Sequence, residues 1–155
     1  MFAIGPETLD VQRTAAQLQG GGADGAVVTF VGLVRNHNAG RRVLYLEYEA
    51  YTPLALKSFE RIADEIRTRW PGAQLALHHR VGRLEIGEAS IVIVTASAHR
   101  ADAFAACRYA IERVKQIAPI WKHEYFEGGD VWIEGAVAAA DDESARAQAE
   151  RLACA

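Results

Sequence analysis

The chain has 155 residues, of which 50% are hydrophobic and 24% are charged, as expected for one globular domain with its own core. We therefore expect a single domain that spans residues 1–155. The net charge of −3 and the pI near 5.9 argue against a general nucleic-acid-binding protein, so any anion site must be local.

The ends and the cysteines give no sign of export or of redox chemistry. The N-terminal residues lack a basic segment, and no stretch reaches the roughly 20 apolar residues that span a bilayer, so we expect a cytoplasmic protein. Cys107 and Cys154 do not form a C-x-x-C pair. We expect Cys107 to be a buried hydrophobic side chain rather than a nucleophile, and Cys154 to be incidental.

The first predicted elements are a helix and a strand. A weak helical pattern at residues 9–18 ends in glycines, and the apolar run at residues 26–34 predicts a buried strand. Gly20, Gly22 and Gly25 match G-x-G-x-x-G by letter. That motif holds a pyrophosphate only when a strand precedes it and a helix follows, whereas here the strand comes after, which argues against dinucleotide binding.

A second strand and a long helix come next. The polar loop at residues 35–43 leads to an alternating pattern at residues 43–51, and the two strands are expected to pair antiparallel. Thr52 is predicted to cap a helix and Pro53 to begin it, and Pro71 marks its end. The apolar stripe of this helix consists of Ala55, Phe59, Ile62, Ile66 and Trp70.

The second half of the chain repeats strands and helices in a mixed order. Strands are predicted at residues 74–81 and 89–96, with a turn-rich connector between them. A helix is predicted from residue 100 to residue 118, because apolar residues recur there at steps of three and four: Phe104, Cys107, Ile111, Val114 and Ala118. Two short strands then surround the turn at residues 128–130, and the alanine-rich tail, residues 138–152, is expected to be helical. This order predicts an α+β, or mixed α/β, fold.

Lys115 is the most unusual residue, because it falls inside the apolar stripe of the second long helix. Burying an ammonium group without a partner is unfavourable. Lys115 therefore either extends its charge to the surface along its apolar stem or lines a pocket that holds an anion.

Other basic residues lie where predicted strands end or turn. His99 and Arg100 stand at the start of a helix, where free N–H groups and the helix dipole favour an anion; alternatively, His99 closes the turn and Arg100 points to solvent. Arg35 begins a basic loop that is either solvated or part of a site. Lys122 and His123 alternate on their strand, so one of the two is expected to face inward or toward a neighbour.

The usual motifs for metal and hydrolase chemistry are missing. The five histidines lack H-E-x-x-H spacing, and the sequence has no G-x-S-x-G elbow or Walker motif. The neighbouring His78 and His79 are expected to be structural. The remaining candidates form a set of basic residues: Arg35, His99, Arg100, Lys115 and Lys122. Together they could bind a phosphorylated substrate. One lysine could also act as a base, acid or nucleophile if its pKa is lowered.

Three blocks of sequence resemble the large, catalytic subunit of molybdopterin synthase. They are GAVVTFVGLVRNHN, SAHRADAF, and KQIAPIWKHE with the later GDVWIE, and they follow in order from about residue 24 to residue 134. The resemblance implies an α/β hammerhead fold with additional antiparallel strands. It also implies a sulfurtransferase of molybdenum cofactor biosynthesis, which converts cyclic pyranopterin monophosphate to molybdopterin by installing two dithiolene sulfurs.

The same resemblance implies protein partners. Sulfur would arrive as a thiocarboxylate on the Gly-Gly terminus of a small ubiquitin-like subunit, whose tail inserts into the large subunit. A homodimer of the large subunit would form the centre of a heterotetramer. No cofactor, metal, nucleic acid or membrane is implied. We expect the small subunit to be a separate chain, because the last residues here contain no Gly-Gly sequence.

The resemblance also assigns roles to residues. Lys115 would be the principal catalytic residue, Lys122 would share proton transfer, and Phe30 would contact the partner's tail. The residues implied to bind phosphate and pterin are Arg35, His99, Arg100, Lys115 and Lys122. Ala136 stands where family members carry an arginine, so one anion contact is expected to be missing or replaced. Two alternatives remain: a noncatalytic module that binds a phosphorylated metabolite or an acidic tail, and a structural subunit.

Overall fold

The computed structural model describes residues 1–18, 22–133 and 135–155. Its elements are, in order, β1 (Phe2–Gly5), α1 (Val11–Ala16), β2 (Ala26–Leu33), β3 (His37–Asn38), β4 (Arg41–Ala50), α2 (Thr52–Arg69), β5 (Gln74–Arg80), β6 (Gly82–Glu85), β7 (Ala89–Ser97), α3 (Arg100–Ile117), β8 (Ile120–Phe126), β9 (Gly129–Ile133) and α4 (Glu143–Ala153). This mixture confirms the predicted α+β class. In the described part of the chain, no helix has the length and apolar character needed to cross a membrane.

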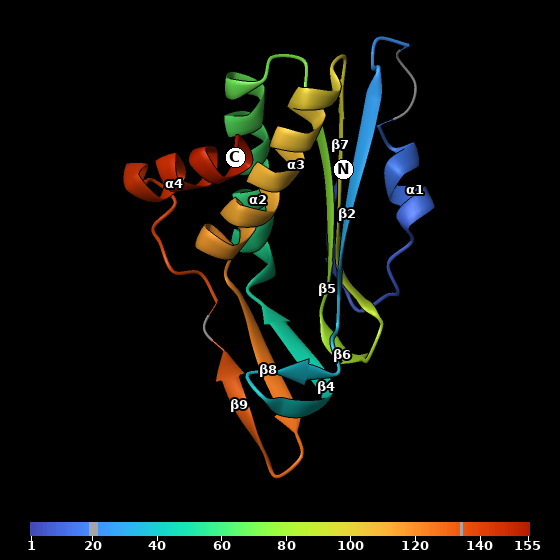
Figure 1. Ribbon diagram of the computed structural model, residues 1–155, viewed down its shortest axis with the longest axis vertical. Helices are drawn as coiled ribbons and strands as arrows, with labels where there is room; N and C mark the ends of the chain where they lie inside the picture. The colour runs from blue at the N-terminus through green and yellow to red at the C-terminus, as the bar shows by residue number, and fades with distance from the viewer. Residues whose placement is uncertain (19–21, 134) are drawn as a thin grey trace.

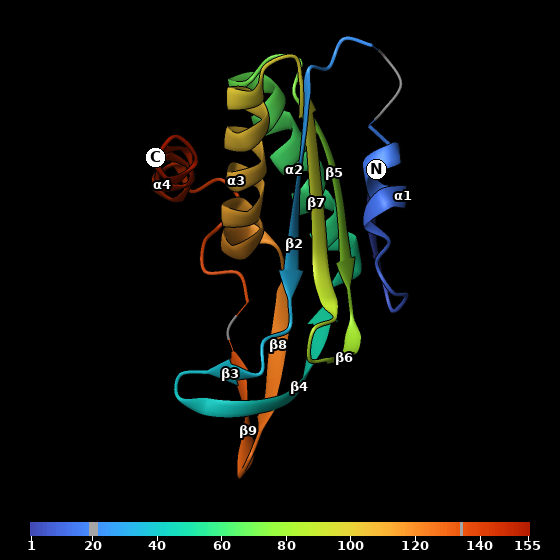
Figure 2. The ribbon, with the colours of Figure 1, turned by 45° about the vertical axis from the view of Figure 1, so that its right-hand side comes forward.

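The first sheet, with strand order β1-β5-β7-β2, has helices on both faces. β1 is parallel to β5, whereas β7 is antiparallel to both β5 and β2. Helices α2 and α3 cover one face, and α1 lies on the other (Figures 1 and 2). Coverage of both faces explains why β7 reads as a nearly continuous apolar run, with every residue from Ser90 to Ser97 buried.

The core is divided by the alternation of side chains along the strands. Leu75 and Leu77 of β5 pack against α2 and α3 in the larger hydrophobic cluster. Ala76, between them, packs in a second cluster with Leu18 and with Val11 of α1. Alternate side chains of β5 therefore pack into two separate hydrophobic clusters.

The second sheet lies beyond the end of the first and projects away from the helices (Figure 1). Its order is β3-β4-β8-β9, and β6 pairs with the same β4 strand. A small cluster stabilises it, composed of Val34, Val43, Leu46 and Leu84. The junction of the two sheets brings β2, β4, β5 and β8 near the C-terminal end of α3, and this is where the site described below forms.

Three short strands were not predicted. β1, β3 and β6 have two to four residues each, too few to show a period of two. The predicted N-cap at Thr52 is also wrong. Tyr51 occupies that position without a side-chain cap bond, and Thr52 is the first helical residue. Gly20, part of the glycine motif, and Glu134 of the W-x-E segment lie outside the described residues.

Candidate active site

A cavity of about 790 Å³ opens between α3 and the junction of the two sheets. Its wall is formed by β2, β4, β5, β7, α3, β8, β9 and the segment that follows β9. This cavity is large enough for a small-molecule ligand, and concave sites between elements are where such ligands usually bind.

Three of the predicted cationic residues line this cavity. Arg35 follows β2, Lys115 lies in the last turn of α3, and Lys122 lies on β8. Arg35 and Lys115 are exposed, whereas Lys122 is partly buried. The sequence prediction that these three side chains share one site is therefore consistent with the structure, with two of them at the mouth and one in the wall.

Lys122 has a modified acidity. Burial lowers its pKa, and the charges of Arg35 and Lys115 lower it further, whereas Glu124 acts in the opposite direction. A lower pKa increases the fraction of neutral amine near pH 7. Lys122 is therefore better suited than an ordinary surface lysine to exchange a proton with a ligand.

The turn between α3 and β8 brings the two lysines to the same cavity. α3 ends at Ile117, and Pro119 in the turn accepts a hydrogen bond of 3.1 Å from the backbone of Tyr51. On β8, Lys122 lines the cavity, while His123 stacks on Trp132 with ring centroids 4.3 Å apart. The prediction that one of these two neighbours faces inward is confirmed, and that one is Lys122.

The apolar pattern put Lys115 within the stripe that faces the core, but in the structure Lys115 does not lie on the buried face of α3. Its side chain is exposed, and Phe104 of the predicted stripe is 64% exposed. The fully buried cation of this helix is Arg113 instead. The buried arc is shifted because α3 packs against α2, α4 and the sheet. Of the two alternatives for Lys115, the structure supports a residue that lines a cavity.

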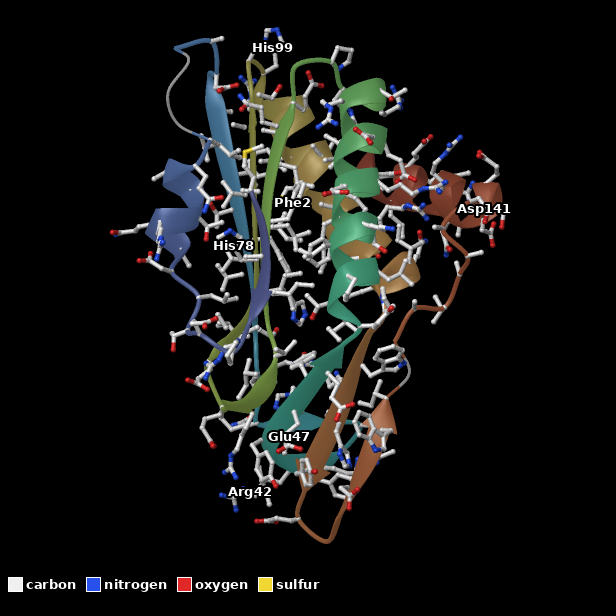
Figure 3. The ribbon with its side chains drawn as sticks, turned by 180° about the vertical axis from the view of Figure 1, so that it is seen from behind. Phe2, Arg42, Glu47, His78, His99 and Asp141 are labelled. Carbon is white, nitrogen blue, oxygen red and sulfur yellow. The ribbon has the colours of Figure 1, made fainter. Side chains whose placement is uncertain are left out.

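His99 and Arg100 are separated from the other cations. They stand at the start of α3 and are exposed, and neither lines the cavity. Arg100 and Lys115 are fifteen positions apart on the helix, which at a rise of 1.5 Å per residue is about 22 Å. Figure 3 places His99 at the end of the molecule opposite Glu47 and Arg42. Within one chain, these two residues therefore lie outside the cavity that Lys115 lines.

Two other residues singled out in the sequence lie at or near the rim of the cavity. Phe30 lines it from β2, an edge strand of the first sheet, and is 38% exposed. Ala136, where the resemblance led us to expect an arginine in the family, is exposed in the segment after β9. Its neighbours Gly135 and Val137 line the cavity. Gly135 has no room for a Cβ, because that atom would meet the carbonyl oxygen of Ile120.

The sequence did not predict that His79 lines the cavity. His78 and His79 are adjacent on β5 and point to opposite faces. His78 contacts α1, with 3.1 Å between its Nδ1 and Oγ1 of Thr14, and Figure 3 shows it on that side of the sheet. His79 is buried and lines the cavity with Tyr48 and Ser90. Alternation within the His-His pair was the only signal for this placement.

Cys107 is buried and Cys154 is exposed, and both are free thiols. Cys107 is buried as predicted, and burial raises the pKa of its thiol to about 11. In residues 1–18, 22–133 and 135–155, no three histidine, cysteine or acidic side chains gather where they could hold a metal ion.

Known proteins resemble this chain over most of its length. The family model described as "MoaE protein" matches residues 4–117. A molybdopterin synthase catalytic subunit of Halalkalibacterium halodurans is 47% identical over 132 residues, which cover 85% of this chain and 84% of the relative. That of Bacillus subtilis is 51% identical over 109 residues, covering 70% and 69%.

Solved structures agree with the sequence matches. The crystal structure of molybdopterin synthase from Staphylococcus aureus superposes with a TM-score of 0.80 at 42% identity, covering 84% of this chain and 95% of that one. A complex of subunits 1 and 2 of the molybdopterin-converting factor from Helicobacter pylori superposes with a TM-score of 0.68 at 25% identity, covering 86% and 90%.

Proposed function

Because the chain belongs to the MoaE family of molybdopterin synthase catalytic subunits, we propose that it transfers sulfur to a phosphorylated pterin in the cavity lined by Arg35, Lys115 and Lys122. The reaction is the conversion of cyclic pyranopterin monophosphate to molybdopterin, a step of molybdenum cofactor biosynthesis in which two dithiolene sulfurs are installed.

One observation carries the proposal. Three cations from three separate elements meet in one cavity, although the chain has a net charge of −3. Concentrating positive charge in this way is unfavourable without an anion, because each charge disfavours the protonated form of its neighbours. Glu124 offsets only part of this charge, as the net lowering of the Lys122 pKa indicates, and a phosphate group would add negative charge and accept several N–H donors at once.

The roles of the lysines follow from their positions. Lys115, exposed at the mouth, stands where a ligand in the cavity and a chain entering from outside would meet, so we assign it as the principal catalytic residue. Lys122, with its lowered pKa, is the group best suited to share proton transfer. Arg35 has a planar guanidinium that can donate two parallel hydrogen bonds to a phosphate, so it is assigned to that group.

The sulfur donor is proposed to be a small ubiquitin-like subunit with a C-terminal thiocarboxylate. The Helicobacter pylori structure is a complex of two subunits of a molybdopterin-converting factor. A thiocarboxylate is an anion, so the same cations that hold phosphate would attract it. Phe30, on the cavity side of the edge strand β2, is placed to contact the entering tail.

His99 and Arg100 require a second copy of the chain if they bind the same substrate. They lie about 22 Å from Lys115 along α3 and do not line the cavity of their own protomer. We therefore propose a homodimer in which the start of α3 of one protomer completes the cavity of its partner. One small subunit on each protomer would then give a heterotetramer.

Reconstitution tests the proposed function. The purified chain is supplied with cyclic pyranopterin monophosphate and a thiocarboxylated small subunit, and the dithiolene product is measured. Lys115→Ala should reduce the rate at least 100-fold, as expected for loss of a catalytic acid or base. The matched control is Lys57→Ala, which removes an exposed lysine of α2 that does not line the cavity.

Two results would contradict the proposal. One is the absence of product under conditions in which an authentic synthase works. If the chain then still bound the pterin, it would be a noncatalytic binding module. The other is a Lys115→Ala variant as active as Lys57→Ala, which would leave Lys115 a surface residue without a catalytic role.

A further inference from the structure

The cavity has two regions of different character. Arg35 and Lys115 stand exposed at its mouth. Farther inside, the wall contains His79 and Ser90, each only 6% exposed, and the partly buried Tyr48. These inner groups are polar but not positively charged, so they do not bind a phosphate in the way that the cations do.

His79 is held as a neutral hydrogen-bond acceptor. Its Nδ1 lies 2.8 Å from the carbonyl oxygen of Arg80, and since a carbonyl only accepts, Nδ1 must carry the proton. Burial lowers the pKa of His79 to about 4, so the ring is uncharged near pH 7. Nε2 therefore has a free lone pair, and none of the described residues donates a hydrogen bond to it.

Tyr48 and Ser90 complete the inner wall. The rings of Tyr48 and His79 meet edge to face with centroids 5.1 Å apart, which fixes the orientation of the imidazole. Burial raises the pKa of Tyr48, so its hydroxyl stays protonated. Ser90 donates to the carbonyl of Gly32 at 3.2 Å, and its side chain also forms a hydrogen bond with Tyr48, so the two hydroxyls lie next to each other in the wall.

We propose that His79, Tyr48 and Ser90 form a hydrogen-bonding subsite for the pterin ring, in which Nε2 of His79 accepts a hydrogen bond from a ring N–H group. This inference rests on the proposed function and specifies how its substrate lies. A neutral acceptor matches the N–H edge of an uncharged heterocycle and offers nothing to a phosphate, which only accepts at its oxygens. The phosphate is then left to the cations at the mouth, and the ring points inward.

Two substitutions of His79 test the contacts of its two ring nitrogens separately. His79→Asn places an amide near the position of Nδ1 and removes the acceptor at Nε2, whereas His79→Gln keeps an acceptor near Nε2. His78→Asn is the matched control, because His78 is the adjacent residue and faces α1 instead of the cavity. Circular dichroism and thermal unfolding establish that each variant is folded.

The measurement is the dissociation constant of each ligand for the homodimer without the small subunit. The ligands are cyclic pyranopterin monophosphate, neopterin as an unphosphorylated pterin, and inorganic phosphate. His79→Asn should weaken both pterins about tenfold, the effect of one neutral hydrogen bond, and leave phosphate unchanged. His79→Gln should stay within about threefold of the wild type, and His78→Asn should match it.

Each contrary outcome has a distinct meaning. Wild-type pterin affinity in folded His79→Asn overturns the subsite. If a separate titration with the small subunit shows that only its affinity falls, the wall belongs to the partner's tail, and the subsite is again overturned. If His79→Asn does not fold, Tyr48→Phe provides the same test, with about fivefold weaker pterin binding expected from loss of its hydroxyl. Wild-type protein that forms no product with the thiocarboxylated subunit overturns the proposed function, whatever the variants bind.

Discussion

Arg113 of α3 and Glu65 of α2 form a buried ion pair through two hydrogen bonds of 2.9 Å. Arg113 is completely buried, and the hydroxyl of Tyr109 donates to the same carboxylate at 2.8 Å. Burial alone would raise the pKa of Glu65, but the hydrogen bonds from Arg113 and Tyr109 hold it below its usual value. Arg113 also donates to the carbonyl of Ala140 at 3.1 Å, so the pair connects both long helices to the segment that borders the cavity.

Breaking this ion pair should destabilise the fold strongly. Glu65→Ala leaves the Arg113 guanidinium buried without its counter-charge, and we expect the free energy of unfolding to fall by about 3–5 kcal/mol. The control is Arg61→Ala, which removes a contact of 3.2 Å to the same carboxylate from a side chain that is 40% exposed. That loss should stay below about 1 kcal/mol. Urea unfolding measures both values, and equal losses would contradict a special role for the buried pair.

Lys122→Arg should separate binding from proton transfer. Arginine keeps the positive charge that a phosphate needs, but its guanidinium does not release a proton at any working pH. We expect the KM for the pterin to change by less than about threefold, while kcat falls about 100-fold or more. Steady-state rates at saturating small subunit provide both constants. Full retention of kcat would show that Lys122 acts only as an anion contact.

Mixed dimers should reveal whether His99 and Arg100 act across the protomer interface. Lys115→Ala and Arg100→Ala are each expected to be inactive as homodimers. When the two variants are mixed and allowed to exchange, half of the dimers contain one of each, and one of their two sites has both residues intact. Activity should then recover to about a quarter of the wild-type value, because a twofold axis relates the two sites. No recovery, with exchange verified by mass spectrometry, would place Arg100 outside the partner's site.

The sequence predicted the regular part of the fold but not which helical residues face the core. The strands around residues 26–33 and 89–97 and both long helices have enough residues to show their periods, and they occur as predicted. On α3, however, the choice between Arg113 and Lys115 depends on packing against other elements. The partner that makes burial of Arg113 favourable is Glu65, which lies 48 residues away in the sequence.

The sequence predicted only some of the residues that line the candidate site, again because local patterns do not show long-range contacts. Arg35, Lys115 and Lys122 follow or lie on strongly patterned elements, so the fold brings them together. His79 gave no comparable signal, since its place in the cavity depends on how the end of β5 leads into the short strand β6, which pairs with β4 of the second sheet. Short pairings and long-range contacts are the features that a local pattern does not encode.

The buried state of His79 should make the stability of the protein depend on pH. Its pKa is about 4 in the folded protein and 6.5 when unperturbed. Above both values neither state is protonated, so stability is at its full value. As the pH falls below 6.5, the unfolded chain binds a proton that the folded chain does not, and the free energy of unfolding should decrease by roughly 2 kcal/mol from pH 7.5 to pH 5. Urea unfolding across this range should show a shallower slope for His79→Gln, and equal slopes for the two proteins would mean that the imidazole is not kept neutral by burial.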